Sequence, residues 1–217
     1  NTDPLNIPQI GQRESYLRIP NTTVQKVEIS KKYTVSMWFK IDGQTVSNIF
    51  SNDGGPPPSL SSLRMGLYDF TGEHQLYWLK ASSTDQHGSV YLRLDTIDDS
   101  GSAANDFIYR LSNHEQDGIK FKEDVWHHVV ISLDTSNDRS DAHVSAWANG
   151  KKCNIIATRS NDGEHIQDLD SDASGFGVAS HSNLTNSSEF AGELIECAIW
   201  NRILDPDEAE TLYEMKY

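Results

Sequence analysis

Strict alternation of apolar and polar side chains is the feature that most constrains the fold of this chain. In residues 33–41, Tyr33 and every second residue after it are apolar and share one face, whereas Trp38 points to the other face. Shorter alternating segments follow at residues 90–94, 126–133 and 144–148. A period of two is that of a β-strand with one buried face. The pattern therefore predicts several short strands around a hydrophobic core.

Polar turns separate these strands. Residues 51–59, 98–102 and 134–141 are rich in Gly, Pro, Asn, Asp and Ser, which supply the backbone freedom and local hydrogen bonds of turns. Asn149-Gly150 directly follows an alternating segment and predicts a tight hairpin. Many short strands joined by turns favour a sandwich or barrel over βαβ units. With 217 residues in the chain, we expect one domain over residues 1–217.

One short helix is predicted near the end of the chain. Asp205 is a capping residue, Pro206 suits the first helical turn, and Glu208 completes a capping box. Apolar residues then recur at helical spacing up to Tyr213. We expect a helix over about residues 206–214, packed on one edge of the sandwich.

Several motifs, in their order and spacing, resemble those of laminin-G-like and pentraxin-like domains of the concanavalin-A-like lectin/glucanase superfamily. They are found at residues 15–20 (SYLRIP), 33–40 (YTVSMWFK), 126–130 (WHHVV), 147–151 (WANGK), 190–194 (FAGEL) and 199–204 (IWNRIL). The resemblance implies an all-β fold, a two-sheet antiparallel jelly-roll sandwich with one short C-terminal helix. It also implies a recognition module, since such domains bind sugars, phosphorylated head groups or proteins.

The charge of the chain restricts its partners. The formal net charge is −14 and the isoelectric point is about 4.8. An acidic surface repels phosphate backbones, so nucleic acid and anionic membranes are poor partners. No apolar run is long enough to span a bilayer, so we expect no membrane insertion.

Two cysteines, Cys153 and Cys197, fall in separate strand-like segments. If these segments are neighbours, a disulfide would close a loop of about 45 residues. The alternative is two buried thiols that act as small hydrophobic side chains.

Enzyme chemistry finds little support, and we expect no catalytic residues. A glycosidase needs two carboxylates across the scissile bond, but Glu193 and Glu196 are three residues apart and would face opposite sides of a strand. His127 and His128 are adjacent, so they also point to opposite faces and cannot share a substrate. The resemblance gives this histidine pair a structural role.

No metal or other cofactor is expected, although calcium is left open. Residues 168–172 resemble half of an oxygen-ligand loop but lack the glycine and glutamate that an EF-hand needs. The acidic calcium cluster of pentraxins is replaced here by residues 177–182 (GVASHS). A laminin-G-type calcium site would use Asp53 as its best candidate ligand.

The candidate ligand-binding residues are aromatic side chains on strands and polar side chains in loops. Trp38, Tyr91 and Trp147 lie opposite the aliphatic faces, where exposed rings stack on sugars or on partner proteins. The alternative is that loops cover these faces. Loops 51–59 and 180–188 are the other candidates, since polar loops on a rigid scaffold commonly carry recognition. They contribute Asn52, Asp53, His181 and Asn183.

These observations favour a non-catalytic module that binds a glycan on a cell or particle surface. The alternative is a structural protein-interaction module within a larger surface assembly, such as a virion or phage particle. A glycoside hydrolase ranks third. For either of the first two functions we expect an extracellular or surface-exposed location.

Overall fold

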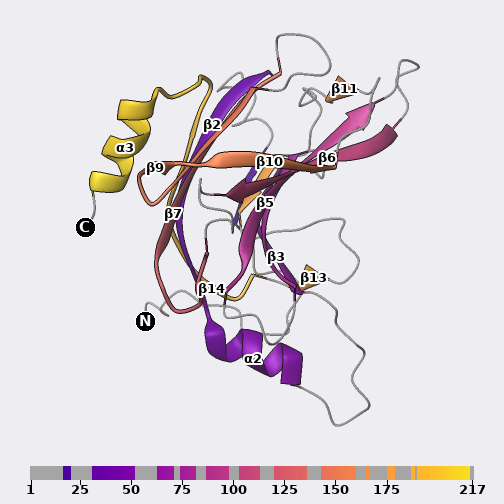
Figure 1. The fold of residues 1–217 in the computed structure, drawn as a ribbon, viewed down its shortest axis with the longest axis vertical. Helices are drawn as coiled ribbons and strands as arrows, with labels where there is room; N and C mark the ends of the chain where they lie inside the picture. Colours follow the sequence, from indigo (N-terminus) through magenta and orange to yellow (C-terminus); the bar gives the residue numbers. More distant parts are fainter. Residues whose placement is uncertain are drawn as a thin grey trace.

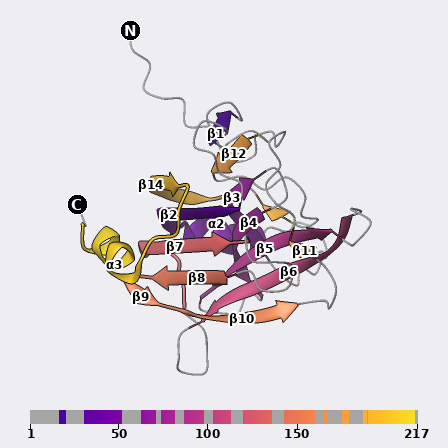
Figure 2. The ribbon, with the colours of Figure 1, turned by 90° about the horizontal axis from the view of Figure 1, so that it is seen from above.

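Two β-sheets face each other in the computed structural model of this chain (Figures 1 and 2). The structure describes residues 17–20, 31–51, 63–70, 74–81, 87–97, 103–112, 120–135, 143–159, 165–166, 175–178, 187–188 and 190–215. Within these residues no helix is long and apolar enough to cross a membrane. The predicted antiparallel sandwich is confirmed.

The smaller sheet has five strands in the order β14-β2-β7-β8-β9. All of its neighbouring strands are antiparallel. The strands are β2 (Lys32–Ile41), β7 (His127–Asp134), β8 (His143–Ala148), β9 (Lys151–Lys152) and β14 (Gly192–Trp200).

The larger sheet has nine strands, seven of them in the order β1-β12-β3-β4-β5-β6-β10. The two-residue strand β11 pairs with β5, and β13 pairs with β3 in the one parallel contact among the described strands. The strands are β1 (Leu17–Pro20), β3 (Leu63–Phe70), β4 (His74–Lys80), β5 (Ser89–Ile97), β6 (Ala103–Ser112), β10 (Asn154–Arg159), β11 (His165–Ile166), β12 (Gly175–Val178) and β13 (Ser187–Ser188).

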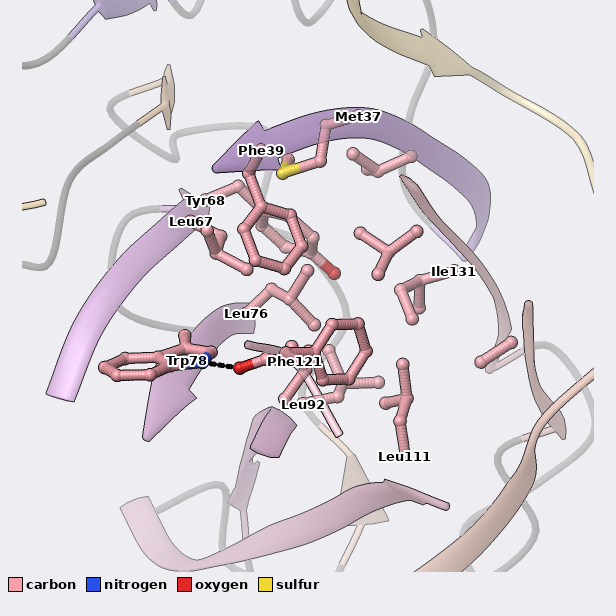
Figure 3. Packing of buried hydrophobic residues seen from close by; sticks show 14 of the residues in the cluster. Met37, Phe39, Leu67, Tyr68, Leu76, Trp78, Leu92, Leu111, Phe121 and Ile131 are labelled. Atoms are coloured by element: carbon pink, nitrogen blue, oxygen red, sulfur yellow. Dashed lines mark hydrogen bonds between the residues drawn. The ribbon is translucent and has the colours of Figure 1, made fainter. Parts of the chain in front are cut away.

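The hydrophobic core fills the space between the two sheets (Figure 3). The alternating residues of β2, from Tyr33 to Ile41, are all buried there, as the sequence predicts. Trp78 of β4 lies at the other side of the core, and its indole Nε1–H donates a hydrogen bond of 3.3 Å to the carbonyl of Phe121. A Cβ at position 88 would lie 2.1 Å from the Trp78 ring, so only glycine fits beneath this tryptophan.

The Asn149-Gly150 hairpin between β8 and β9 is confirmed. Both residues have positive φ, at 51° and 77°, as a two-residue hairpin with the right-handed twist of its strands requires. The side chain of Asn149 accepts a hydrogen bond of 2.9 Å from the backbone N–H of His128 on the neighbouring strand β7. This bond links the histidine motif to the hairpin motif.

Helix α3 (Pro206–Glu214) has the predicted bounds and the predicted capping box between Asp205 and Glu208. Its placement on one edge of the sandwich was wrong. Ala209 and Leu212 pack against Trp147 and Val130, which point outward from the five-stranded sheet. The helix therefore lies against the outer face of that sheet, because its apolar side needs an apolar partner (Figure 1).

A second helix, α2 (Gly43–Ser51), was not predicted. Asp42 begins it by accepting hydrogen bonds from the backbone N–H of Gln44 and the hydroxyl of Thr45. Asp42 followed by Gly43 resembles a turn in sequence, so the capping signal was overlooked.

Of the two alternatives for Cys153 and Cys197, the structure has the free thiols and not the disulfide. Cys197 lies on edge strand β14, whereas Cys153 directly follows β9 at the opposite edge of the same sheet. Four strand intervals separate these edges, about 19 Å at the usual strand spacing, far beyond the reach of a disulfide. Burial raises the pKa of each thiol to about 12, so both are neutral and packed as small apolar groups.

Candidate functional site

The outer face of the nine-stranded sheet carries cationic, aromatic and amide side chains at adjacent positions. They come from the central strands β3, β4, β5 and β6, at positions that alternate with core residues such as Leu76 and Leu92. We call this set the arginine–tyrosine face, and its members are Arg64, Gln75, Tyr77, Tyr91, Arg93 and Arg110.

Two tyrosines form the centre of the arginine–tyrosine face. Tyr77 and Tyr91 are directly opposite each other on β4 and β5, and their rings stack at 5.5 Å with an interplanar angle of 9°. Arg64 lies over the Tyr77 ring at 5.6 Å, and Arg110 is the partner of Tyr91 on the next strand. Cross-strand aromatic pairs and cation–π contacts each contribute up to about 1 kcal/mol, so the arrangement is held in place.

Gln75 and Arg93 form the neighbouring cross-strand pair. The Arg93 Nη1–H donates a hydrogen bond of 3.0 Å to Oε1 of Gln75, whose side chain is fully buried. The Gln75 Nε2 amide and the Arg110 Nε–H are buried and have no hydrogen-bond partner in the described part of the chain. A buried donor without a partner costs about 1–3 kcal/mol.

The charges of this face stand out against the rest of the chain. Lys32, Lys80 and Arg202 each contact a carboxylate at 2.6–2.9 Å. No ion pair is found between Arg64 or Arg110 and a described carboxylate side chain, but the strand register also places Asp69, Asp95 and Asp106 on this face. The partly exposed guanidinium groups and the ring of Tyr91 provide hydrogen-bond donors and a stacking surface for a sugar.

Helix α3 covers the aromatic part of the outer face of the five-stranded sheet. Trp147 is only 4% exposed, and it packs with Val130, Leu204 and Ala209. Trp38 stacks on Tyr213 of α3 at 5.5 Å and on His128 at 4.9 Å. A helix, instead of loops, therefore covers these rings: Trp147 is buried beneath it, and Trp38, stacked on the helix, stays partly exposed.

Helix α3 packs tightly against the Asn149-Gly150 hairpin. A Cβ at Gly150 would lie 2.6 Å from Cδ1 of Tyr213, so glycine is needed for contact as well as for its backbone angle. His128 packs between these elements, with its Nε2 at 2.8 Å from the hydroxyl of Ser36. Burial lowers the pKa of His128 to about 4, so its imidazole is neutral at pH 7.

His127 points to the opposite face, as predicted. Its ring contacts Phe39 and Phe121 in the core, and its Nε2 lies 3.0 Å from the carbonyl of Lys122. Burial lowers the pKa of His127, and the hydrogen bond to Lys122 opposes this effect. The two histidines therefore hold strands and the helix in place and do not share a site.

The two acidic residues of strand β14, Glu193 and Glu196, differ in their backbone setting. A bulge interrupts its pairing with β2 between Ile195 and Ala198, and Glu196 has a positive φ of 52°. Glu193 forms an ion pair with Lys40. Because of this bulge, simple alternation does not predict the side of the strand to which Glu196 points. The sequence still lacks a run of carboxylates at alternating positions.

Of the predicted site residues, the structure places only Tyr91 in the arginine–tyrosine face. Asn52, Asp53, His181 and Asn183 lie outside the described residues. The other members of the face, Arg64, Gln75, Tyr77, Arg93 and Arg110, are not among the predicted site residues. A signal is present in the sequence, since Arg64, Tyr77 and Arg93 each fall between two apolar residues.

The chain belongs to the concanavalin A-like lectin/glucanase superfamily, because a laminin-G-type family model of that description matches residues 11–210. A search among curated protein sequences gives no match. The description of this superfamily covers both lectins and glucanases.

Solved structures with a similar fold have very different sequences. A heptameric SAP-like pentraxin from Limulus polyphemus is 13% identical, with a TM-score of 0.46 over 85% of this chain and 70% of that chain. The binding domain of botulinum neurotoxin serotype C1 is 12% identical, with a TM-score of 0.49 over 93% of this chain and 41% of that one. An endo-beta-1,4-glucuronan lyase from the fungus Trichoderma reesei is 10% identical, with a TM-score of 0.45 over 88% and 77%.

Proposed function

We propose that this chain is a non-catalytic recognition module that binds a glycan on its arginine–tyrosine face. The observation that carries the proposal is the stacked pair of Tyr77 and Tyr91 on the central strands, flanked by arginines. Tyr91 is partly exposed, so its ring is available to the apolar face of a sugar. Tyr77 is buried beside it, and the stacking of the two rings fixes the orientation of Tyr91.

We propose further that the chain binds the glycan without cleaving it. Glycoside hydrolysis needs an acid and a second carboxylate about 5–10 Å apart. In the sequence, the alternating acidic run by which glycosidases of this fold carry their catalytic carboxylates is missing. The packed histidines His127 and His128 are engaged in structural contacts.

The proposed setting is outside the cell or on the surface of a particle, where glycans are displayed. The second function suggested by the sequence is a protein-interaction module. No feature of the described residues favours that function over glycan binding at the arginine–tyrosine face. Partners in a larger assembly would therefore be additional to glycan binding.

A glycan array, with and without calcium, tests the proposal. We expect binding that Tyr91→Ala abolishes and that Tyr91→Phe, which keeps the stacking ring, largely retains. Circular dichroism of both variants controls for folding. A protein that binds no glycan, or a Tyr91→Ala variant that binds as well as the parent, would contradict the proposal. Release of reducing ends during long incubation with a bound polysaccharide would contradict its non-catalytic part.

A further inference from the structure

We infer that helix α3 is an acid-released cover of the five-stranded sheet: protonation of His128 lifts the end of the helix that carries Tyr213, while the sandwich stays folded. This inference goes beyond the proposed function, since it concerns the sheet opposite the arginine–tyrosine face. It is carried by three observations: the surroundings of the His128 imidazole, the separation of the helix contacts from the main core, and the anchoring of the first turn of α3.

The imidazole of His128 is enclosed between the sheet and α3. It is only 1% exposed, and the rings of Trp38 and Tyr213 lie beside it with centroid distances of 4.9 and 6.0 Å. Its Nε2 is 2.8 Å from the hydroxyl of Ser36, whereas its Nδ1 is buried and has no hydrogen-bond partner among the described residues. An imidazolium donates from both ring nitrogens. The charged form would therefore bury an N–H group that has no acceptor, which is unfavourable.

The side chains that surround His128 carry no charge. Strand β2 contributes Ser36 and Trp38, the hairpin contributes Asn149, and α3 contributes Tyr213, which is the titratable group among these contacts. On these elements the charged residues closest in sequence to the contacts are Lys40, Lys151 and Glu214. None of them forms an ion pair with His128, and the neighbouring His127 points into the core. Within the described part of the chain, a proton on His128 is therefore not compensated by a carboxylate.

Release of the helix relieves this situation because it hydrates the imidazole. In the docked state burial lowers the pKa of His128 to about 4. In the released state the ring meets water, where the pKa of a histidine is about 6.5. The released state therefore binds the proton more tightly, and docking weakens as the pH falls from about 6.5 toward 4.

The contacts of α3 form an apolar cluster apart from the main core. Val130 and Trp147 of the sheet pack with Leu204, Ala209 and Leu212 on the outer side, where α3 is a separate layer (Figure 1). No residue of α3 belongs to the described core cluster between the sheets. Loss of the helix contacts leaves that core intact, so local release needs less free energy than global unfolding. A helix of nine residues is not stable alone, so its amides lose protection on release.

The start of α3 is anchored independently of the imidazole. The hydroxyl of Thr34 donates a hydrogen bond of 2.7 Å to the carbonyl of Arg202 and accepts one of 3.2 Å from the N–H of Leu204. The Arg202 guanidinium donates two hydrogen bonds, of 2.6 and 2.7 Å, to the carboxylate of Glu208 and thereby lowers the pKa of Glu208 to about 2. Glu208 stays ionised at pH 5, so the first turn keeps this contact while the last turn, with Tyr213, moves.

Hydrogen exchange of the full chain at pH 7 and pH 5 tests the inference. Protection factors, corrected for the intrinsic exchange rate at each pH, are compared between peptides from α3 and from the core strand β2. With pKa values of about 4 in the docked state and about 6.5 in the released state, the protection of α3 should fall about 20-fold between pH 7 and pH 5. The protection of β2 should change less than about threefold, because the sandwich stays folded.

Substitutions assign the effect to His128. His128→Gln keeps a hydrogen-bonding side chain that takes up no proton, so its α3 protection should differ less than about threefold between the two pH values. The matched control His87→Gln removes a partly exposed histidine next to β5, on the other sheet, and should keep the parental loss. Tyr213→Ala, outside the main core, hydrates the imidazole at both pH values, so its α3 protection should be low throughout and change less than about fivefold. Circular dichroism verifies that all three variants are folded.

Several outcomes would overturn the inference. An equal loss of protection in α3 and β2 would show that acid unfolds the whole sandwich. Protection of α3 that does not change between pH 7 and pH 5 would show that the helix is not released. The parental loss in His128→Gln or in Tyr213→Ala would assign the effect to other groups. None of these measurements involves a glycan, so failure of the proposed function would leave this inference intact, and the reverse also holds.

Discussion

The outer face of the five-stranded sheet carries Trp38, His128 and Trp147, whereas that of the nine-stranded sheet carries Tyr91, with arginines on both sides. On both sheets, these aromatic rings lie on the face that points away from the hydrophobic core. The first is covered by α3, whose Leu212 and Tyr213 pack onto the tryptophans. The second keeps Arg64, Tyr91 and Arg110 partly exposed. An aromatic ring on a strand thus becomes core or recognition surface according to its neighbours.

The largest difference between the faces is expected in stability. Trp147→Ala should lower the free energy of unfolding by about 3–5 kcal/mol, because it leaves a cavity under α3. Tyr91→Ala should cost only about 1 kcal/mol, since a partly exposed ring loses mainly its stacking on Tyr77. Urea unfolding measures both. Equal costs would show that the faces do not differ in burial.

Acid should weaken the covered face through His128. Its pKa is lowered from 6.5 to about 4 in the folded state by burial, so the unfolded chain binds the proton more tightly. The stabilising contribution is complete above about pH 6.5 and is lost as the pH falls toward 4, by at most about 3 kcal/mol. Unfolding measured between these values should show this slope. In His128→Gln it should be shallower, and an unchanged slope would assign the effect to other groups.

The hairpin contact with α3 is expected to matter next. Gly150→Ala should cost about 2 kcal/mol, because alanine is strained at a φ of 77° and its Cβ would meet Tyr213. In a Tyr213→Ala background only the backbone strain remains, so the same change should cost about 1 kcal/mol. A double-mutant cycle in urea measures the difference. Simple additivity would mean that α3 does not press on the hairpin.

The smallest effect is expected at the start of the helix. Asp205→Ala removes the hydrogen bond of 2.9 Å to the backbone N–H of Glu208 and should cost about 1 kcal/mol. Asp207→Ala changes another acidic residue of the first turn, two residues further along. It keeps the cap and should cost less than half as much. Glycan affinity should be unchanged in both variants, since α3 lies on the other sheet. A parallel loss of affinity would couple the two faces.

Local signals in the sequence were reliable where one segment determines the structure. The Asn149-Gly150 turn, the capping box at Asp205 and the alternation of β2 each depend on neighbouring residues, and all three are confirmed. The failures concern which segments meet. Neither the distance between Cys153 and Cys197 nor the covering of Trp38 by α3 follows from periodicity, because both depend on strand order and helix docking.

The arginine–tyrosine face likewise could not be predicted from local sequence signals. Alternation placed Tyr91 on an outer face, yet its partners Tyr77 and Arg110 lie on other strands and are brought together by pairing register. A shift of one residue in either strand would turn these side chains into the core. The loop candidates around Asp53 and His181 lie outside the described residues, so they stay predictions.

The distance between the outermost arginines of the arginine–tyrosine face also sets the length of glycan that can contact all of it. Arg64 lies on β3 and Arg110 on β6, with β4 and β5 between them. Three strand intervals correspond to about 14 Å. A single sugar would meet only one part of this row, whereas an oligomer running across the strands would meet both ends. Affinity should therefore rise with degree of polymerisation until the oligomer reaches from β3 to β6, and then level off.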